Sequence, residues 1–258
     1  EELFKETARF KYVAGDVSFV RQLSWTDYSV ALGAIFKALV NPDHGVIKSL
    51  SEIHAVGHRA VHGGDKFTDS VIIDDQVIEK MEQVKDLAPL HNPANLKGIH
   101  QCIAMLPNTP QVAVFDTAFH QTIPEHVHVY PLPYKLYEKE GIRQYGFHGT
   151  SCQYVMQRVE RSFGMSRKNS KIVICHLGNG VSVTAVKNGQ SVDTSLGFTS
   201  VGGMMMGSRV GDLDPGVMQY MLREMGMSSE EFDHMMHKES GLVGVSGRSN
   251  DMRAIEEA

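Results

Sequence analysis

The sequence predicts an α/β fold, because segments with strand patterns alternate with segments with helix patterns along its 258 residues. The composition agrees with a packed globular chain, since hydrophobic residues make up 42% and charged residues 21%. A chain of this length can bury a sizeable core, in one large domain or two small ones. A disordered or collagen-like chain is excluded.

The first half of the chain alternates between apolar strands and helices. Helices are predicted over residues 26–40, 74–85 and 93–106, and strands over residues 53–61, 71–73 and 111–115. Asn92 is expected to cap the third helix, with Pro93 at its first position. The last strand delivers Asp116 at its carboxyl end, where α/β folds place catalytic groups. Asp116 followed by Thr117 also suits a helix N-cap, so both interpretations stay open.

The second half carries the strongest strand signal. Strands are predicted over residues 172–175, 181–186 and 191–195, helices over residues 150–163, 215–225, 229–237 and 251–258, and a loop over residues 202–211. Asn188-Gly189 is typical of a type I′ hairpin turn. Residues 123–134 hold three prolines and are the best linker candidate, so we expect two αβ lobes joined near residue 120. The last helix ends before any C-cap signal and no Met opens the chain, so we expect an excerpt of a longer protein.

Charge and histidine spacing exclude several classes of function. The net charge of −5, from 25 basic and 30 acidic residues, gives no electrostatic reason to expect nucleic acid or an anionic membrane. The longest apolar run, residues 30–40, is broken by Lys37 and is too short to span a bilayer. The 13 histidines lack metal-ligand spacing, which disfavours a His-rich metalloprotein.

The sulfur-containing residues have plain structural interpretations. Three widely spaced cysteines without a C-x-x-C pair indicate reduced thiols in a cytosolic protein. Cys152 is expected to be a small buried residue. Residues 204–206, three methionines in a row, are expected to fill the core.

Glycine-rich segments hold the candidate anion-binding residues. Gly178-Asn179-Gly180 would let backbone N–H groups approach an anion, but the same triplet is ordinary turn chemistry. Arg59 and Arg209 lie near glycines, where a planar guanidinium suits bidentate binding of a carboxylate or phosphate. A structural arginine that holds loop carbonyls is an equal alternative for either one.

Short motifs follow one another in a fixed order from about residue 50 to the end. They are GHRAVHGG at residues 57–64, LAPLHNP at 87–93, FDTAFH at 115–120, YGFHGTS at 145–151, HLGNG at 176–180, DTSLGFT at 193–199, MMGSR at 205–209, SGL at 240–242 and DMR at 251–253. Any one motif is unspecific. The ordered set resembles the acetate kinase family, in the superfamily of sugar kinases, heat-shock chaperone ATPases and actin.

The resemblance implies a reaction and an architecture. The reaction is direct, reversible phosphoryl transfer from ATP to acetate, giving acetyl phosphate and ADP, with Mg²⁺ or Mn²⁺. The architecture is two RNase H-like lobes, both incomplete here, over residues 1–118 on the acyl and phosphoryl side and 119–258 on the nucleotide side. It also implies a homodimer. The cysteine and charge patterns described above add the expectation of a cytoplasmic protein without a nucleic acid or membrane partner.

The resemblance assigns roles to individual residues. Arg59 would bind the substrate carboxylate or phosphoryl group, and Arg209 and His148 would stabilise the transferring phosphoryl group. Asp116 would be the family's essential carboxylate, and His91 would lie close to the transferring group. The apolar pocket for the acyl methyl group would be formed by Val61, Leu90 and Phe147. The nucleotide would be held by His176, Leu177, Gly178, Asn179, Gly180, Asp251, Met252 and Arg253.

Physical chemistry agrees with these assignments. Departures from the family pattern bear on which acyl chain the site accepts. A carboxylate is already deprotonated at neutral pH, so attack on a phosphoryl group needs alignment and charge neutralisation rather than a strong base. Cys152 replaces the family's usual His, and the loop with Ser200 and Gly202 lacks its usual Pro and acidic residue. Propionate or butyrate kinase is therefore the near alternative.

The motifs that are absent matter as much. The family's opening phosphate loop, its later Gly-rich adenosine motif and its metal-holding Glu are not in this sequence. We therefore expect these 258 residues to be inactive by themselves. A truncated module that binds adenine nucleotide without turnover is the alternative from a different class.

Overall fold

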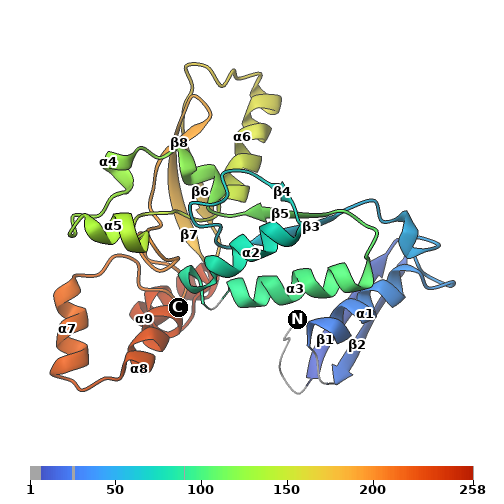
Figure 1. The fold of residues 1–258 in the computed structure, drawn as a ribbon. Helices are drawn as coiled ribbons and strands as arrows, with labels where there is room; N and C mark the ends of the chain where they lie inside the picture. Colours follow the sequence, from blue (N-terminus) through green and yellow to red (C-terminus); the bar gives the residue numbers. More distant parts are fainter. Residues whose placement is uncertain (1–6, 25–26, 90, 258) are drawn as a thin grey trace. The chain divides into compact units, whose positions relative to one another are not determined.

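The structure is a computed structural model that describes residues 7–24, 27–89 and 91–257. By its contacts the chain forms two compact units, one of residues 1–60 and 70–114 and one of residues 61–69 and 115–258. Figure 1 shows the elements of both units. The predicted lobe boundary after residue 118 stays a prediction.

The first unit contains an antiparallel hairpin of β1 (Thr7–Ala14) and β2 (Val17–Ser24) that the sequence analysis missed. Cross-strand pairing places Phe10 opposite Arg21 and Tyr12 opposite Phe19. Because side chains alternate between the two faces of a strand, these four residues share one face.

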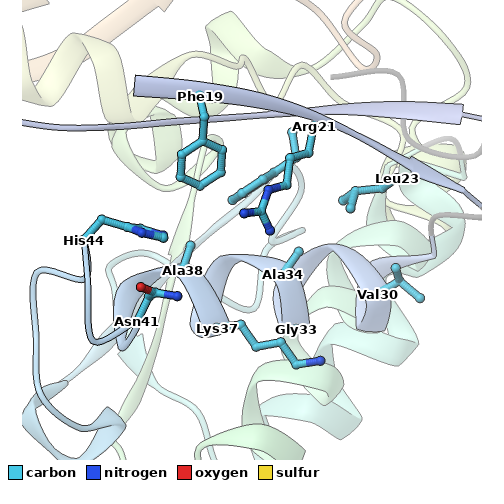
Figure 2. A pocket seen from close by; sticks show the side chains of 11 residues that line it. Phe19, Arg21, Leu23, Val30, Gly33, Ala34, Lys37, Ala38, Asn41 and His44 are labelled. Carbon is cyan, nitrogen blue, oxygen red and sulfur yellow. The ribbon is translucent and has the colours of Figure 1, made fainter. Parts of the chain in front are cut away.

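Helix α1 (Tyr28–Leu39) follows the hairpin, where a helix was predicted. Asp27 caps it by accepting a 2.9 Å hydrogen bond from the Val30 N–H, and Thr26 lies outside the described residues. A groove of about 430 Å³ lies between α1 and β2, with Arg21 and Phe19 reaching toward the helix from the strand (Figure 2). Gly33 and Ala34 line the groove on the helix side.

A three-stranded sheet in the order β3-β5-β4 completes the first unit, from β3 (Val56–Ala60), β4 (Val71–Ile72) and β5 (Gln111–Phe115). All three strands were predicted, although β3 is shorter than expected. Helices α2 (Asp75–Gln83) and α3 (Asn92–Met105) were predicted too, and α3 contacts α1, α2 and β3. Short 3-10 turns η1 (Leu50–Glu52) and η2 (Lys85–Leu87) join them.

The predicted capping role of Asn92 is wrong. His91 occupies the N-cap position of α3, and Asn92 is the first helical residue. The Asn92 side chain donates a 3.2 Å hydrogen bond to the Val84 carbonyl, just after α2. Its buried amide therefore ties α3 to α2 instead of capping α3.

The second unit is built on an antiparallel sheet in the order β6-β7-β8, from β6 (Lys171–Leu177), β7 (Val181–Lys187) and β8 (Gln190–Thr194). The turn between β7 and β8 has φ values of 55° at Asn188 and 80° at Gly189. Positive φ at both central residues is what a type I′ turn requires, as predicted.

Helix α6 (Gly149–Phe163) packs on this sheet (Figure 1). Its buried Cys152 and Met156 contact Ile174 of β6 and Val186 of β7. Cys152 is fully buried, which confirms the prediction of a small core residue. Among the methionines of residues 204–206, only Met206 is buried; Met204 and Met205 are nearly half exposed, so the core prediction is wrong for those two.

The remaining elements of the second unit are short. They are η3 (Ala118–Thr122), α4 (Glu125–His128), α5 (Lys135–Glu140), α7 (Pro215–Arg223), α8 (Ser229–His234), the π-helical turn η4 (Met235–Glu239), α9 (Gly241–Ser246) and α10 (Met252–Glu256). Helices α4, α5 and α9 were not predicted. Within the described ranges, no helix is long and apolar enough to cross a membrane.

Candidate functional site

Asp116 follows β5 directly and is almost completely buried. Its backbone carbonyl accepts a 2.8 Å hydrogen bond from the Gly149 N–H, and the Thr150 hydroxyl donates to its Oδ1 at 3.3 Å. The cap position of η3 is Thr117, so the N-cap interpretation of Asp116 is wrong. Asp116 instead fixes the first turn of α6, directly after His148.

His148 sits in a strained backbone conformation at the start of α6. Its φ of 60° lies in the left-handed region, which non-glycine residues rarely adopt. Its Nδ1 lies 3.0 Å from the hydroxyl of buried Ser182. Its ring stacks on the His176 ring with centroids 4.0 Å apart, and His176 Nδ1 lies 2.9 Å from the Ser151 hydroxyl.

Arg209 is half-buried in the loop that precedes α7. Its Nη1 donates a 3.0 Å hydrogen bond to the Ser200 carbonyl and lies 3.8 Å from Met206 Sδ. Burial lowers the pKa of the guanidinium from its ordinary value, but such a group stays protonated at neutral pH. Over the described ranges, no carboxylate forms an ion pair with Arg209. A half-buried cation without a carboxylate suits an anion from outside the chain.

The side chains of His148 and Arg209 both approach Gly180. A Cβ placed on Gly180 would lie 3.2 Å from His148 Nε2 and 3.4 Å from Arg209 Nη1. Any larger residue would therefore occupy the space that these two side chains border. The structure thus joins His148, Arg209 and the predicted glycine turn in one place within the second unit.

The predicted nucleotide segments also approach each other. The Gly207 N–H donates to the Asn179 carbonyl at 3.1 Å, and Asn250 Nδ2 donates to Asn179 Oδ1 at 3.0 Å. Asn250 precedes Asp251, which caps α10 by accepting from the Arg253 N–H. The Gly178 N–H donates a hydrogen bond within the turn, to the Gly180 carbonyl at 3.1 Å. This amide therefore stabilises the turn itself.

An apolar cluster borders this region. Phe147, Leu196 and Met206 are buried, and Val61 and Val181 pack against them. Val61 and Phe147, predicted to share an acyl pocket, are therefore brought together, whereas Leu90 lies outside the described residues. Among the remaining predicted residues, Arg59 is exposed on β3 and His91 occupies the N-cap position of α3, both in the first unit.

Hydrogen bonds after residue 61 explain why this segment belongs to the second unit. The Gly63 N–H donates to the Thr117 hydroxyl at 3.0 Å, and Gln121 Nε2 donates to the Gly64 carbonyl at 3.2 Å. The ring of His62 packs edge-on against Tyr145 and Phe147. These contacts hold Val61 close to the loop that follows Asp116.

Several supporting residues were missed by sequence reasoning. Ser182 and Ser151 contact the two stacked histidines, and Ser200 offers only its carbonyl to Arg209. No local signal marks them, because the two serine–histidine contacts join residues 25 and 34 positions apart and the Ser200 contact uses a backbone carbonyl that any residue would offer. As for metals, no cluster of three or more His, Cys, Asp or Glu side chains able to hold an ion occurs in the part of the chain that is described.

The chain is an α/β protein in which an arginine and a histidine side chain border a glycine turn, an arrangement typical of anion-binding sites. The chain belongs to the Acetokinase family, whose model matches residues 1–258. It is 54% identical over 232 residues to the acetate kinase of Clostridium botulinum (strain 657 / Type Ba4), covering 90% of this chain and 58% of that protein. It is 52% identical over 231 residues to the acetate kinase of Clostridium kluyveri, covering 90% and 57%.

Solved structures agree. The crystal structure of Porphyromonas gingivalis acetate kinase matches with a TM-score of 0.93 and 46% identity, over 100% of this chain and 65% of that one. A propionate kinase from Francisella tularensis matches with a TM-score of 0.92 and 40% identity, over the same shares. These likenesses confirm the predicted α/β fold of the actin-like ATPase type. The chain spans about 58% of the length of the curated relatives.

Proposed function

We propose that the whole protein is an acetate kinase, which transfers the terminal phosphoryl group of ATP to acetate and gives acetyl phosphate and ADP, reversibly. The observation that carries the proposal is the half-buried Arg209 guanidinium, which borders the same space beside Gly180 as His148 Nε2. Membership of the Acetokinase family and 54% identity to an acetate kinase support it.

The transfer needs charge neutralisation more than proton removal. An acetate oxygen attacks the terminal phosphorus while the bond to the bridging oxygen of ADP breaks, so the bonding electrons leave with ADP. Because acetate is deprotonated at neutral pH, no general base is required. The transition state spreads negative charge over the equatorial oxygens. Arg209 supplies positive charge to these oxygens, and His148 donates a hydrogen bond from Nε2 when Ser182 donates to its Nδ1.

The remaining proposed site residues position these groups or the substrates. Asp116 holds the first turn of α6 through Gly149 and Thr150, which supports the backbone after His148. Arg59 binds the acetate carboxylate or the phosphoryl group and His91 lies near the transferring group. Val61, Leu90 and Phe147 form the pocket for the methyl group.

The proposed nucleotide site combines two segments, residues 176–180 and 251–253. The hydrogen bond from Asn250 to Asn179 supports this combination, because it joins the glycine turn of the first segment to the residue just before the second. Mg²⁺ or Mn²⁺ would accompany ATP as its counter-ion and neutralise phosphate charge. No step is assigned to the metal, since the described residues hold no metal cluster. We further propose two lobes, over residues 1–118 and 119–258, and a cytoplasmic homodimer.

A propionate kinase is the second candidate. It is favoured by the likeness to the Francisella tularensis propionate kinase and by the residues of the loop that holds Ser200 and Gly202. The Ser200 carbonyl accepts from Arg209, so this loop touches the proposed phosphoryl site directly. The residues of this loop are therefore expected to influence which acyl chain length the enzyme prefers.

A hydroxamate assay of the whole protein with ATP and Mg²⁺ tests the proposal. Acetate, propionate and butyrate are compared at equal concentrations. The proposal expects acyl hydroxamate to form fastest from acetate. Faster product from propionate would favour the second candidate, and ATP binding without any acyl phosphate would leave a nucleotide-binding module.

A further inference from the structure

His120 lies four residues after Asp116, in η3, and its side chain is fully buried. Both ring nitrogens have partners: Nε2 lies 2.9 Å from the Phe147 carbonyl oxygen and Nδ1 lies 2.9 Å from the Ser191 hydroxyl. A carbonyl oxygen can only accept, so Nε2 carries the proton. In the neutral ring Nδ1 must then accept from Ser191, which fixes the tautomer.

Burial keeps this ring neutral, since it lowers the pKa of His120 to about 4. At pH 7 the imidazole therefore donates through Nε2 alone. Ser191, itself fully buried in β8, anchors the opposite edge of the ring. The position of His120 in η3 and the contact of its ring with Ser191 of β8 together fix the direction of the hydrogen bond to Phe147.

The backbone that His120 holds is unusual. Gly146 has φ of 73° and His148 has φ of 60°, so left-handed residues flank Phe147 on both sides. A Cβ on Gly146 would lie 2.9 Å from the His120 ring, so the ring packs directly over this turn. A left-handed non-glycine residue persists only where its surroundings enforce it. His120 supplies a hydrogen bond and a packing surface at that point.

We infer that His120 is a positioning residue: its Nε2–H bond to the Phe147 carbonyl holds the 146–148 turn in its left-handed conformation and so aims the His148 ring into the phosphoryl site. This inference rests on the proposed function, because it assumes that His148 acts on the transferring phosphoryl group. His120 itself makes no contact with substrate. It acts through the peptide that precedes His148.

Two conservative substitutions separate positioning from bulk packing. In His120→Gln the side-chain amide reaches the place of Nε2 and still donates to Phe147. In His120→Asn the amide reaches only the place of Nδ1, so the Phe147 bond is lost. We expect kcat of the Gln variant to stay within about tenfold of the wild type, and that of the Asn variant to fall roughly 100-fold with KM for ATP and acetate little changed.

His128→Asn is the matched control. His128 is another buried histidine of the second unit; its Nδ1 lies 3.1 Å from the Ile123 carbonyl and its Nε2 lies 3.3 Å from the Tyr137 hydroxyl, so neither hydrogen-bond partner of the ring belongs to residues 146–148. This variant is expected to keep the wild-type kcat. Equal kcat in the Gln and Asn variants of His120 would overturn the inference, because loss of packing alone affects both alike.

A second readout is independent of catalysis. Nitrogen-15 NMR of the wild-type chain should show His120 as the neutral Nε2–H tautomer at pH 7, and the backbone coupling of His148 should report positive φ. In the Asn variant the coupling should change, and in the Gln variant it should not. A charged or Nδ1–H ring, or a His148 coupling that the Asn variant leaves unaltered, would overturn the inference. A wild type without acyl kinase activity that still passes these NMR tests would refute the proposed function instead.

Discussion

Replacing Arg209 with alanine removes the cation that the account places next to the transferring phosphoryl group. The guanidinium is half-buried and no described carboxylate pairs with it, so its charge is available to a bound anion. At an effective dielectric constant of about 20, two unit charges 4 Å apart interact by about 4 kcal/mol. Since ~1.4 kcal/mol corresponds to tenfold in rate, Arg209→Ala should lower kcat by roughly 1,000-fold.

The same substitution should cost far less in folding. It removes the hydrogen bond from Nη1 to the Ser200 carbonyl, which is worth about 1 kcal/mol of stability, and a long, weak contact to Met206 Sδ. Hydroxamate kinetics of the whole protein give kcat, calorimetric titration gives ATP affinity, and urea unfolding gives stability. Arg223→Ala, at the exposed end of α7, is the matched control and should change none of the three.

The pattern of losses decides whether the reasoning holds. A large fall in kcat with ATP affinity little changed is expected. A parallel fall in ATP affinity would mean that Arg209 holds the nucleotide rather than the transferring group. A loss of less than about tenfold would mean that the guanidinium is a structural group for the Ser200 loop.

Three further predictions concern stability. Burial lowers the pKa of both His62 and His120 to about 4, whereas an unfolded histidine titrates near 6.5, so the unfolded chain binds protons first as the pH falls. Urea unfolding should therefore show the free energy of unfolding falling between pH 6.5 and pH 4, by up to ~3 kcal/mol for each ring. The fall should be smaller in His62→Phe, which has one of the two rings fewer. Gly146→Ala should lower the free energy of unfolding by more than ~2 kcal/mol, because its Cβ would lie within 3 Å of Thr194 and His120. Gly226→Ala, also at positive φ but in open space, should lower it by only about 1 kcal/mol. Equal losses of stability in calorimetry would refute the steric argument. Gly33→Ala, inside α1 with open space at its Cβ, should raise the free energy of unfolding by up to ~1 kcal/mol in urea titrations (Figure 2). A lower free energy of unfolding in this variant would show that no space for a methyl group exists beside Gly33.

Sequence reasoning succeeded where the signal is local. The Asn188-Gly189 turn needs positive φ at two adjacent residues, and few residue pairs allow that. Strand β5 was predicted at its observed bounds because it is a short, mostly apolar run that is followed by the polar residue Asp116. The β1–β2 hairpin was missed although Gly15-Asp16 and the alternation around it carry a two-residue turn signal.

What failed depends on tertiary contacts. Asn92 has the residue type and position of a helix cap, but in the structure its side-chain amide donates a hydrogen bond to the Val84 carbonyl at the end of α2. Met204 and Met205 look like core residues, but the loop turns only Met206 inward. Likewise, the sequence could indicate His148 and Arg209 as candidates, whereas the partners that orient them, Ser182 and the Ser200 carbonyl, become visible only in three dimensions.

A crystal structure of the whole protein with acetate and a non-hydrolysable ATP analogue would show directly whether Arg209 and His148 bind the transferring phosphoryl group. The terminal phosphoryl oxygens should lie within hydrogen-bond distance of both Arg209 Nη1 and His148 Nε2, above Gly180. A terminal phosphoryl group bound elsewhere, with Arg209 still donating only to the Ser200 carbonyl, would contradict it.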